Sequence, residues 1–316
     1  MSLKQQLRFA RELIEPLRVS PGRTVGLDED FDPGYTGGLS GKVEAGARLS
    51  EGISLLAEYQ DRLAAQDSFG VLLVLQGIDG SGKDGTIKHV MSGVNPGGVE
   101  VHSFKQPSTE ELSHDFLWRY ERALPERGRI GIYNRSHYEE VLVVRVHPEL
   151  LAAQRLPPVD RRGDIWERRY REINDWELYL ADNGIRLAKV MLHLSKQEQA
   201  KRFLKRIEHP EKNWKFSADD VREREHWEEY REAFEQMLTH TSTEWAPWYV
   251  VPADHKWFAR LAAAAILITA LAEIDPHYPQ PAPAALAEMR RAAAALDAEI
   301  GKGSGSYGGA SVKGQR

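Results

Sequence analysis

The sequence predicts an α/β protein in which a parallel, five-stranded sheet lies between two layers of helices. Short apolar runs alternate with long helical patterns over residues 71–252, which is typical of strand–helix–strand units. The most apolar of these runs leads directly into a glycine-rich loop and then into a helical pattern. The chain has 316 residues, of which 41% are hydrophobic and 28% charged, so it is long enough to bury a core of this size.

Five apolar runs are interpreted as the strands of this sheet. They are residues 71–76, 99–104, 130–133, 187–194 and 248–251. Helix starts are marked between them by two capping-box sequences, at 108–111 and 195–198, in which Ser and Glu side chains can satisfy free amide groups.

The flanking segments complete the predicted organisation. We expect a helical N-terminal extension over 1–68 and the main α/β domain over 69–275, with a helical lid at about 196–225. An Ala-rich pattern predicts a C-terminal helix within 276–300, and the Gly/Ser-rich stretch 301–316 is expected to be disordered.

Composition excludes several kinds of site. The chain has no Cys, which rules out disulfides, Cys–zinc modules, thiol nucleophiles and iron–sulfur centres and fits a cytoplasmic enzyme. We find no apolar run of about 18–20 residues and no apolar signal core near the start, so we expect neither a membrane span nor a secretory signal. The net charge is −5, so an anion site must be a local concentration of basic residues.

The glycine-rich loop that follows the first predicted strand reads GIDGSGK over residues 77–83. In this context it predicts a phosphate-binding loop, in which glycines let the backbone curl and Lys83 offers its ammonium to phosphates; the alternative is a Gly-rich turn. Asp84 stands where an ordinary P-loop has a Ser or Thr that binds Mg²⁺. A carboxylate beside phosphates requires a cation, so Asp79 is predicted to bind Mg²⁺, unless it merely accepts a backbone hydrogen bond.

The third predicted strand ends in the polar residues Asn134 and Arg135, at the edge where open α/β sheets bind ligands. Asn134 stands where an acidic metal ligand is expected and would bind Mg²⁺ more weakly or through water. Arg135 can offer a fork of donors to phosphoryl oxygens, although a surface salt bridge is the alternative. Ser136 and His137 are neighbours that would not face each other on a helix, so we do not expect a nucleophile–base pair.

A basic segment over residues 196–215 holds seven basic and three acidic residues. Arg202 and Arg206 are four residues apart and project from one helix face, and Pro210 interrupts the helix before another begins. This pattern predicts a lid that carries arginines to a transferring phosphoryl group; the alternative is a solvated helix. Nucleic-acid binding is not expected because no aromatic platform is interleaved with the charges.

As a set, these segments resemble the family-2 polyphosphate kinases. The matching pieces are GIDGSGKDGTIKHVMSGVNP (77–96), SFKQPS (103–108), IYNRSHYEEVLVVRVHPE (132–149) and RFLKRIEHPEKNWKFS (202–217). The family is similar in fold to thymidylate kinase, a P-loop kinase with a three-layer α/β/α domain and a lid. The resemblance implies reversible phosphoryl transfer between inorganic polyphosphate and adenine or guanine nucleotides, dependent on Mg²⁺ or alternatively Mn²⁺.

Residue roles follow from the same resemblance. It implies that Lys83, Arg135, Arg202 and Arg206 hold polyphosphate and transition-state oxygens and that Asp79 holds the metal. Asn134 followed by SHYEEV is similar to the subgroup that accepts AMP as well as ADP, so we expect AMP to be converted to ADP and then ATP; Glu140 would help to place Mg²⁺ or the smaller acceptor. The remaining candidate phosphate- or nucleotide-binding residues are Gly77, Gly80, Ser81, Gly82, Asp84, Gly85, Thr86, Lys88, Lys105, Arg119, Lys212 and Lys215.

The acceptor in such a reaction needs no general base, because a phosphate monoester is largely ionised near pH 7 with a second pKa of about 6. Two alternatives stay open. One is an ATP-dependent nucleoside or nucleoside-monophosphate kinase with Asp79 or Glu140 as base. The other is a polyphosphate- or nucleic-acid-binding regulator without turnover. The Ala-rich C-terminal helices indicate a homo-oligomer, a dimer or tetramer.

Overall fold

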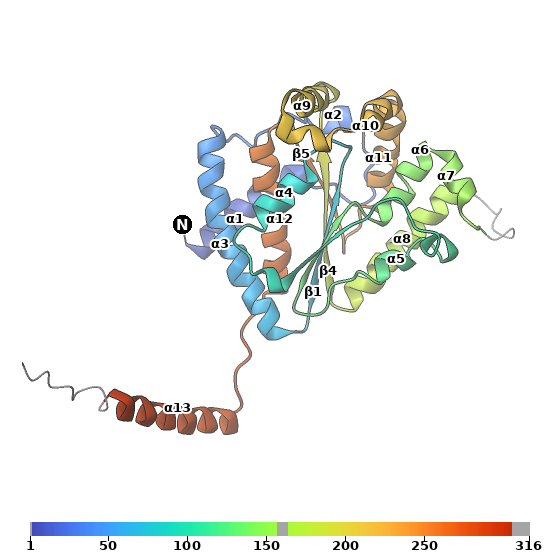
Figure 1. Ribbon diagram of the computed structural model, residues 1–316. Helices are drawn as coiled ribbons and strands as arrows, with labels where there is room; N and C mark the ends of the chain where they lie inside the picture. The colour runs from blue at the N-terminus through green and yellow to red at the C-terminus, as the bar shows by residue number, and fades with distance from the viewer. Residues whose placement is uncertain (1, 157–163, 305–316) are drawn as a thin grey trace, which may run out of the picture. The chain divides into compact units, whose positions relative to one another are not determined.

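The sheet has five parallel strands in the spatial order β2-β3-β1-β4-β5 (Figure 1). The computed structural model describes residues 2–156 and 164–304. The strands are β1 (Gly70–Gln76), β2 (Val99–Ser103), β3 (Ile130–Asn134), β4 (Ile185–His193) and β5 (Trp248–Pro252). Each predicted strand is present with its ends within two residues of the prediction, so the parallel five-stranded α/β fold is confirmed.

Helices cover both faces of this sheet, as the three-layer prediction requires (Figure 1). Those before β3 are α1 (Leu3–Ile14), α2 (Leu27–Asp30), α3 (Lys42–Gln66), α4 (Lys83–Val90) and α5 (Trp118–Glu121). Between β3 and β5 lie α6 (Val143–Val146), α7 (Pro148–Ala153), α8 (Ile165–Asp182), α9 (Lys196–Glu208), α10 (Ala218–Arg222) and α11 (Trp227–Thr241). The chain continues with α12 (Lys256–Ile274) and α13 (Pro283–Ser304).

One face of the sheet is covered by α1, α3, α4 and α12 (Figure 1). Its buried side chains include Val71, Leu73 and Leu75 of β1, whereas the alternate residues Leu72 and Val74 face the other core, beneath α5, α8 and α11. Helices α1 and α3 both pack against α12. The segment predicted as an N-terminal extension therefore supplies part of the helical layer, because α12 is apolar on most sides and needs covering.

Among the described residues, α12 is the one helix long and apolar enough to cross a membrane, with a mean hydropathy of 1.7. From the sequence we expect no apolar run of this length, because Arg260 and Glu273 interrupt the apolar residues of α12. Because 72% of the apolar window is buried inside the protein, the composition of α12 is that of a core helix.

The capping sequences have different outcomes. Ser195 caps α9, and its hydroxyl accepts a bond from the amide of Glu198. Ser108 and Glu111 make the reciprocal pair of capping bonds, at 3.2 and 2.7 Å, but only the short 3₁₀ turn Glu111–Ser113 follows.

The chain divides into two compact units, after His277. The second unit contains α13, which runs from Pro283 to Ser304. Residues 301–304 belong to the last turn of α13, and residues 305–316, where disorder is also expected, lie outside the described part of the chain.

Candidate active site

The glycine-rich loop joins β1, the central strand, to the start of α4. Gly77 has a φ of 148°, and a Cβ at this position would lie 2.9 Å from the carbonyl oxygen of Leu192. Gly82, at φ 107°, directly precedes the first residue of α4, Lys83. Other residues would be strained at both glycines. Because α4 begins directly after Gly82, the loop lies against the positive end of the α4 dipole.

Three charged side chains meet above this loop. Arg135 Nη2 lies 2.6 Å from Asp79 Oδ1, and Lys83 Nζ lies 4.0 Å from the same oxygen. Burial alone would raise the pKa of Asp79, but Lys83 and Arg135 outweigh it and lower that pKa below its usual value. Burial lowers the pKa of Lys83, opposed by Asp79, and its ammonium donates to the carbonyl oxygen of Gly77 at 2.6 Å.

Asn134 and Asp84 meet at the same edge of the sheet. Asn134 Nδ2 donates to Asp84 Oδ1 at 2.8 Å and to Ser103 Oγ at 3.3 Å. Both positions depart from the usual P-loop pattern: Asn134 stands where an acid is expected, and Asp84 stands where a Ser or Thr is expected. The structure places the carboxylate of Asp84 beside Asn134, where the expected acid is missing. Within 2–156 and 164–304 no group of three His, Cys, Asp or Glu residues could hold a metal alone. Mg²⁺ is commonly held by one or two carboxylates together with substrate phosphates, and Asp79 and Asp84 fit that requirement.

Arg202 is predicted to contact substrate, but in the structure it braces the loop. Its side chain is 4% exposed and donates to the carbonyl oxygens of Gly80 and Ser81, at 3.0 and 2.9 Å. It also donates to the carbonyl oxygens of Ala253 and Asp254 after β5. Gln199, one turn earlier on α9, donates to the carbonyl oxygen of Asp79 at 2.7 Å. The inner end of the predicted lid is thus bonded to the phosphate loop.

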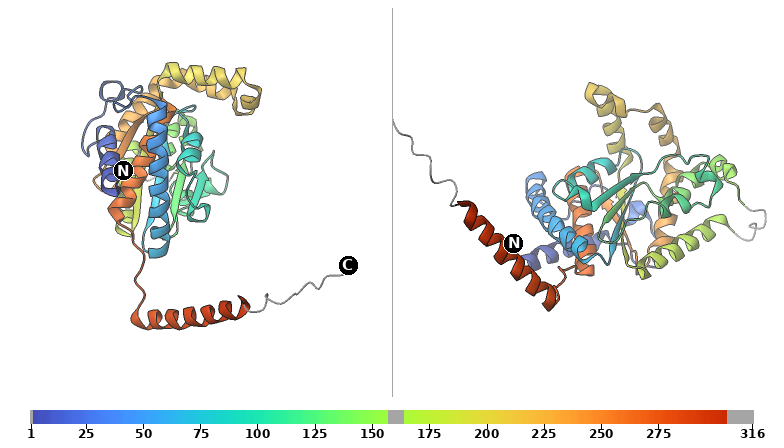
Figure 2. Two further views of the ribbon diagram at one scale, coloured as in Figure 1. Left: turned by 90° about the vertical axis from the view of Figure 1, so that its left-hand side faces the viewer. Right: turned by 60° about the horizontal axis from the view of Figure 1, so that its bottom comes forward.

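The outer part of the lid is more open. Arg206 Nη1 lies 2.8 Å from Asp220 Oδ2 of α10, and Lys212 and Lys215 belong to the 3₁₀ turn Pro210–Lys215 between α9 and α10. Burial and the charge of Asp79 raise the pKa of Asp220, although Arg206 opposes them. Figure 2 shows α9 and the segment after it projecting from the body of the sheet and its helices.

A cavity of about 810 Å³ lies between the loop and the lid. Ten basic and two acidic residues line it, namely Lys83, Lys105, Arg135, Arg202, Lys205, Arg206, Lys212, Lys215, Lys256 and Arg260, with Asp79 and Asp84. The predicted residues Gly80, Ser81, Gly82, Gly85, Thr86 and Asn134 line it too. Sequence reasoning missed Ser103, Phe104, Gln106, Lys205, Lys256, Ala259 and Arg260 as lining residues. Lys256 and Arg260 could have been found, because they stand one helical turn apart just after the last predicted strand.

Four candidates do not line this cavity. Gly77 lies beneath it as the acceptor for Lys83, and Lys88 is exposed on α4. Arg119 and Glu140 line a second cavity, of about 490 Å³. Glu140 Oε2 lies 2.7 Å from Arg169 Nη1, so the structure places Glu140 in the second cavity, apart from Asp79 and Asn134, with which the resemblance groups it around a metal.

The second cavity adjoins the first through the segment after β2. Lys105 and Gln106 line the first cavity and Pro107 lines the second, while Arg119 Nη2 donates to the carbonyl oxygen of Lys105 at 2.9 Å. Phe116 also lines the second cavity. A strongly basic cavity therefore lies beside one of mixed polar and aromatic character.

This sheet order, with a glycine-rich loop after the central strand and a basic lid over it, defines a P-loop kinase fold. Residues 40–279 match the protein-family model described as Polyphosphate kinase 2 (PPK2), and the chain belongs to this family.

Similar proteins carry matching descriptions. The chain is 47% identical over 276 residues to the ADP-polyphosphate phosphotransferase of Rhodopseudomonas palustris, covering 86% of this chain and 94% of that protein. It is 43% identical over 255 residues to the AMP/ADP-polyphosphate phosphotransferase of Meiothermus ruber, covering 81% and 90%. The crystal structure of polyphosphate kinase 2 from Arthrobacter aurescens is similar, with a TM-score of 0.78, 39% identity and coverage of 87% of this chain and 95% of that one.

Proposed function

We propose that this protein transfers phosphoryl groups reversibly between inorganic polyphosphate and nucleotides, converting AMP to ADP and ADP to ATP. The observation that carries the proposal is the excess of ten basic over two acidic residues around the phosphate loop. A linear polyanion needs many cations along one path, whereas the net charge of the chain is −5. The names of the relatives from R. palustris and M. ruber support the same substrates.

Catalysis in this proposal rests on positioning and charge. The donor's terminal phosphates lie against the loop, where Lys83 and Arg135 neutralise the charge that develops on the transferred group. Arg206 approaches the same group from the lid. Since the acceptor phosphate is already ionised near pH 7, no side chain has to remove a proton.

The acceptor nucleotide is proposed to occupy the second cavity. A volume of about 490 Å³ suits a nucleotide, and Phe116 and the neighbouring arginines can contact a base and a phosphate. The cavity adjoins the phosphate loop at Lys105, so a phosphate held there can face the donor.

We propose Mg²⁺ as the cofactor, with Mn²⁺ as a substitute. Asp79, Asp84 and Asn134 would hold it, because their oxygens lie at the cavity that receives the phosphates. When bound, the ion would neutralise charge on the phosphate oxygens.

The chain is also proposed to form a homo-oligomer, a dimer or tetramer. On α13 the apolar residues Leu286, Met289, Ala293, Leu296 and Ile300 recur at alternating spacings of three and four, and the four long side chains are 40–72% exposed. A second copy of this helix would cover them. Met289→Glu/Leu296→Glu is expected to lower the mass found by sedimentation velocity; an unchanged mass would contradict the proposal.

The function is tested by incubating the protein with AMP, polyphosphate and Mg²⁺ in the absence of ATP. The proposal expects ADP and then ATP to form, and Lys83→Ala to lose this activity. An ATP-dependent kinase would form no product until ATP is supplied. A regulator without turnover would bind polyphosphate in a salt-sensitive way and form no product under either condition.

A further inference from the structure

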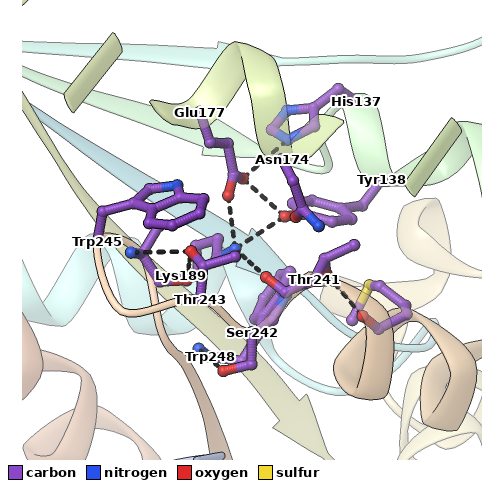
Figure 3. Close-up of polar contacts among 12 residues, drawn as sticks. His137, Tyr138, Asn174, Glu177, Lys189, Thr241, Ser242, Thr243, Trp245 and Trp248 are labelled. Carbon is purple, nitrogen blue, oxygen red and sulfur yellow. Dashed lines mark hydrogen bonds and ion pairs between the residues drawn. The ribbon is translucent and has the colours of Figure 1, made fainter. Parts of the chain in front are cut away.

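Four polar side chains are completely buried under the sheet, outside both cavities. Lys189 comes from β4, Glu177 from α8, and His137 and Tyr138 from the 3₁₀ turn His137–Glu140 after β3; each is 0% exposed. Figure 3 shows these side chains converging from their separate elements. The proposed reaction uses none of them.

The cluster is closely bonded. Lys189 Nζ donates to Glu177 Oε2 at 2.6 Å, to Tyr138 Oη at 2.9 Å and to the carbonyl oxygen of Thr241 at 2.6 Å. The second carboxylate oxygen of Glu177 accepts the hydroxyl of Tyr138 at 2.6 Å and lies 3.2 Å from His137 Nε2. One ion pair between a strand and a helix therefore contacts the first two residues of the turn, His137 and Tyr138 (Figure 3).

A buried ion pair is a poor means of gaining stability, because the cost of desolvating two charges can exceed their attraction. A role in fixing geometry accounts better for its presence. Ser136, the residue before His137, is held in place as well: Ser136 Oγ accepts a hydrogen bond from Gln76 Nε2 at 2.9 Å and another from the amide of Tyr138 at 3.3 Å. Ser136 and His137 thus have separate partners, as expected of residues that do not form a nucleophile–base pair.

Arg135 directly precedes this fixed segment and has a φ of 64°. A residue other than glycine keeps this left-handed conformation only where its surroundings enforce it. The amide of Arg135 donates to the carbonyl oxygen of Leu75 at 3.2 Å, which fixes the strand side. Its guanidinium reaches Asp79 at 2.6 Å and Glu139 at 3.2 Å. Arg135 is therefore held between the end of β3 and the buried cluster.

We propose that the Glu177–Lys189 pair positions Arg135. By bonding to His137 and Tyr138, the pair stabilises the left-handed conformation of Arg135 that directs its guanidinium toward the phosphate loop. Glu177, Lys189 and Tyr138 are positioning residues and touch no substrate. The inference rests on the proposed function only in taking Arg135 as a phosphate-binding residue.

The test is a double-mutant cycle between Tyr138→Phe and Arg135→Lys, which retains a charge and hence measurable function. Tyr138→Phe removes one hydroxyl and keeps the ring. We expect it to lower kcat about 10-fold in the wild-type background, because small misplacements of a positioned group reduce rates strongly. The KM for AMP should stay within about twofold, since Arg135 acts on the phosphates being transferred. In the Arg135→Lys background the same change should lower kcat less than about twofold.

Tyr133→Phe is the matched control. Tyr133 is equally buried, and its hydroxyl donates to the carbonyl oxygen of Tyr120 without joining the Glu177–Lys189 cluster. It should leave kcat within about twofold of wild type at a comparable loss of thermal stability. Glu177→Gln, which keeps the shape of the side chain, should reproduce the coupling to Arg135→Lys.

Binding of inorganic tripolyphosphate, measured by calorimetry in the same four proteins, provides a readout without turnover. The proposal expects Tyr138→Phe to weaken binding only when Arg135 is present. The proposal would be overturned if Tyr138→Phe lowered kcat and affinity by the same factor in the wild-type and Arg135→Lys backgrounds. It would also be overturned if the Tyr138→Phe protein stayed within twofold of wild type in both kcat and affinity. If wild type binds tripolyphosphate but forms no ADP or ATP, the proposed function fails, and the binding cycle still decides the positioning role.

Discussion

Arg202 and Arg206 are one helical turn apart in the lid, yet the structure predicts opposite consequences for removing them. Arg202→Ala takes away a guanidinium that is 4% exposed and bonded to four backbone carbonyls and to Glu198 at 3.0 Å. Loss of one partner of such a buried charged network costs about 3–5 kcal/mol. At roughly 2–4 °C per kcal/mol for a large domain, Tm should fall by about 6–20 °C.

Arg206→Ala removes a side chain that is 22% exposed and paired chiefly with Asp220. The stability lost should stay below about 1 kcal/mol, which is the usual worth of an ion pair that solvent reaches. Its effect should instead be on phosphoryl transfer, because Asp220, the carbonyl oxygen of Lys215 and the ring of Phe203, which this guanidinium contacts, all lie in the lid, and the side chain lines the cavity that receives the phosphates. Arg202→Lys should remain destabilised, since the three donors of one ammonium cannot replace the five bonds that the three guanidinium nitrogens make.

The assay is urea unfolding followed by circular dichroism, without substrate so that ligand binding does not mask stability. Transfer activity is measured for both variants well below the unfolding transition. If Arg202→Ala unfolds within about 1 kcal/mol of wild type and loses as much transfer activity as Arg206→Ala, the bracing role is refuted. Arg202 would then act on substrate as its sequence pattern predicts.

Three further outcomes are expected. Arg135→Ala should lower polyphosphate-driven ATP synthesis by about 10³-fold or more, by analogy with arginine fingers, and a rate within about threefold of wild type would remove Arg135 from the site. Asp79→Asn should raise the Mg²⁺ concentration for half-maximal activity at least about tenfold, whereas Glu140→Gln should not; the reverse order in a Mg²⁺ titration would restore Glu140 as a ligand. Burial lowers the pKa of His137 below 6.5 despite the opposing Glu177. The unfolded chain therefore binds a proton that the folded chain does not, and stability should fall as pH drops below about 6.5. Urea midpoints between pH 7 and 5 should decline less steeply for His137→Gln, and equal slopes would contradict this.

Local patterns were sufficient to predict the sheet. Four of the strands are runs of mostly apolar residues, whereas β2 contains two valines among polar residues and has no buried residue. The loop at 77–83 lies between a buried strand and a helix start. The meeting of Asn134 with the loop also followed from the sequence, because the carboxyl ends of neighbouring parallel strands share one edge.

Contacts between distant segments decided the remaining roles. Arg202 and Arg206 look alike by spacing. The carbonyl oxygens that distinguish Arg202 belong to Gly80, Ser81, Ala253 and Asp254, which lie about 50 to 120 residues away in the chain. Glu139 and Glu140 are adjacent, but Glu139 pairs with Arg135 while Glu140 pairs with Arg169. Periodicity within a segment contains no information about such partners.

The buried cluster left one signal in the sequence, a Lys inside the predicted strand 187–194. Lys is almost never fully buried without a partner, so Lys189 predicts a buried acid. Its partner, Glu177, lies on a helix with several other acidic residues, and only the fold selects it.

The central claim is that polyphosphate is the donor and a nucleotide phosphate the acceptor. Its most direct measurement is the fate of ³²P in uniformly labelled polyphosphate incubated with unlabelled AMP, Mg²⁺ and the protein, with no ATP present. The account predicts that label enters the β-phosphate of ADP first and ATP later, and that Lys83→Ala abolishes both. Label that remains in polyphosphate, or that is released only as free phosphate, would contradict it.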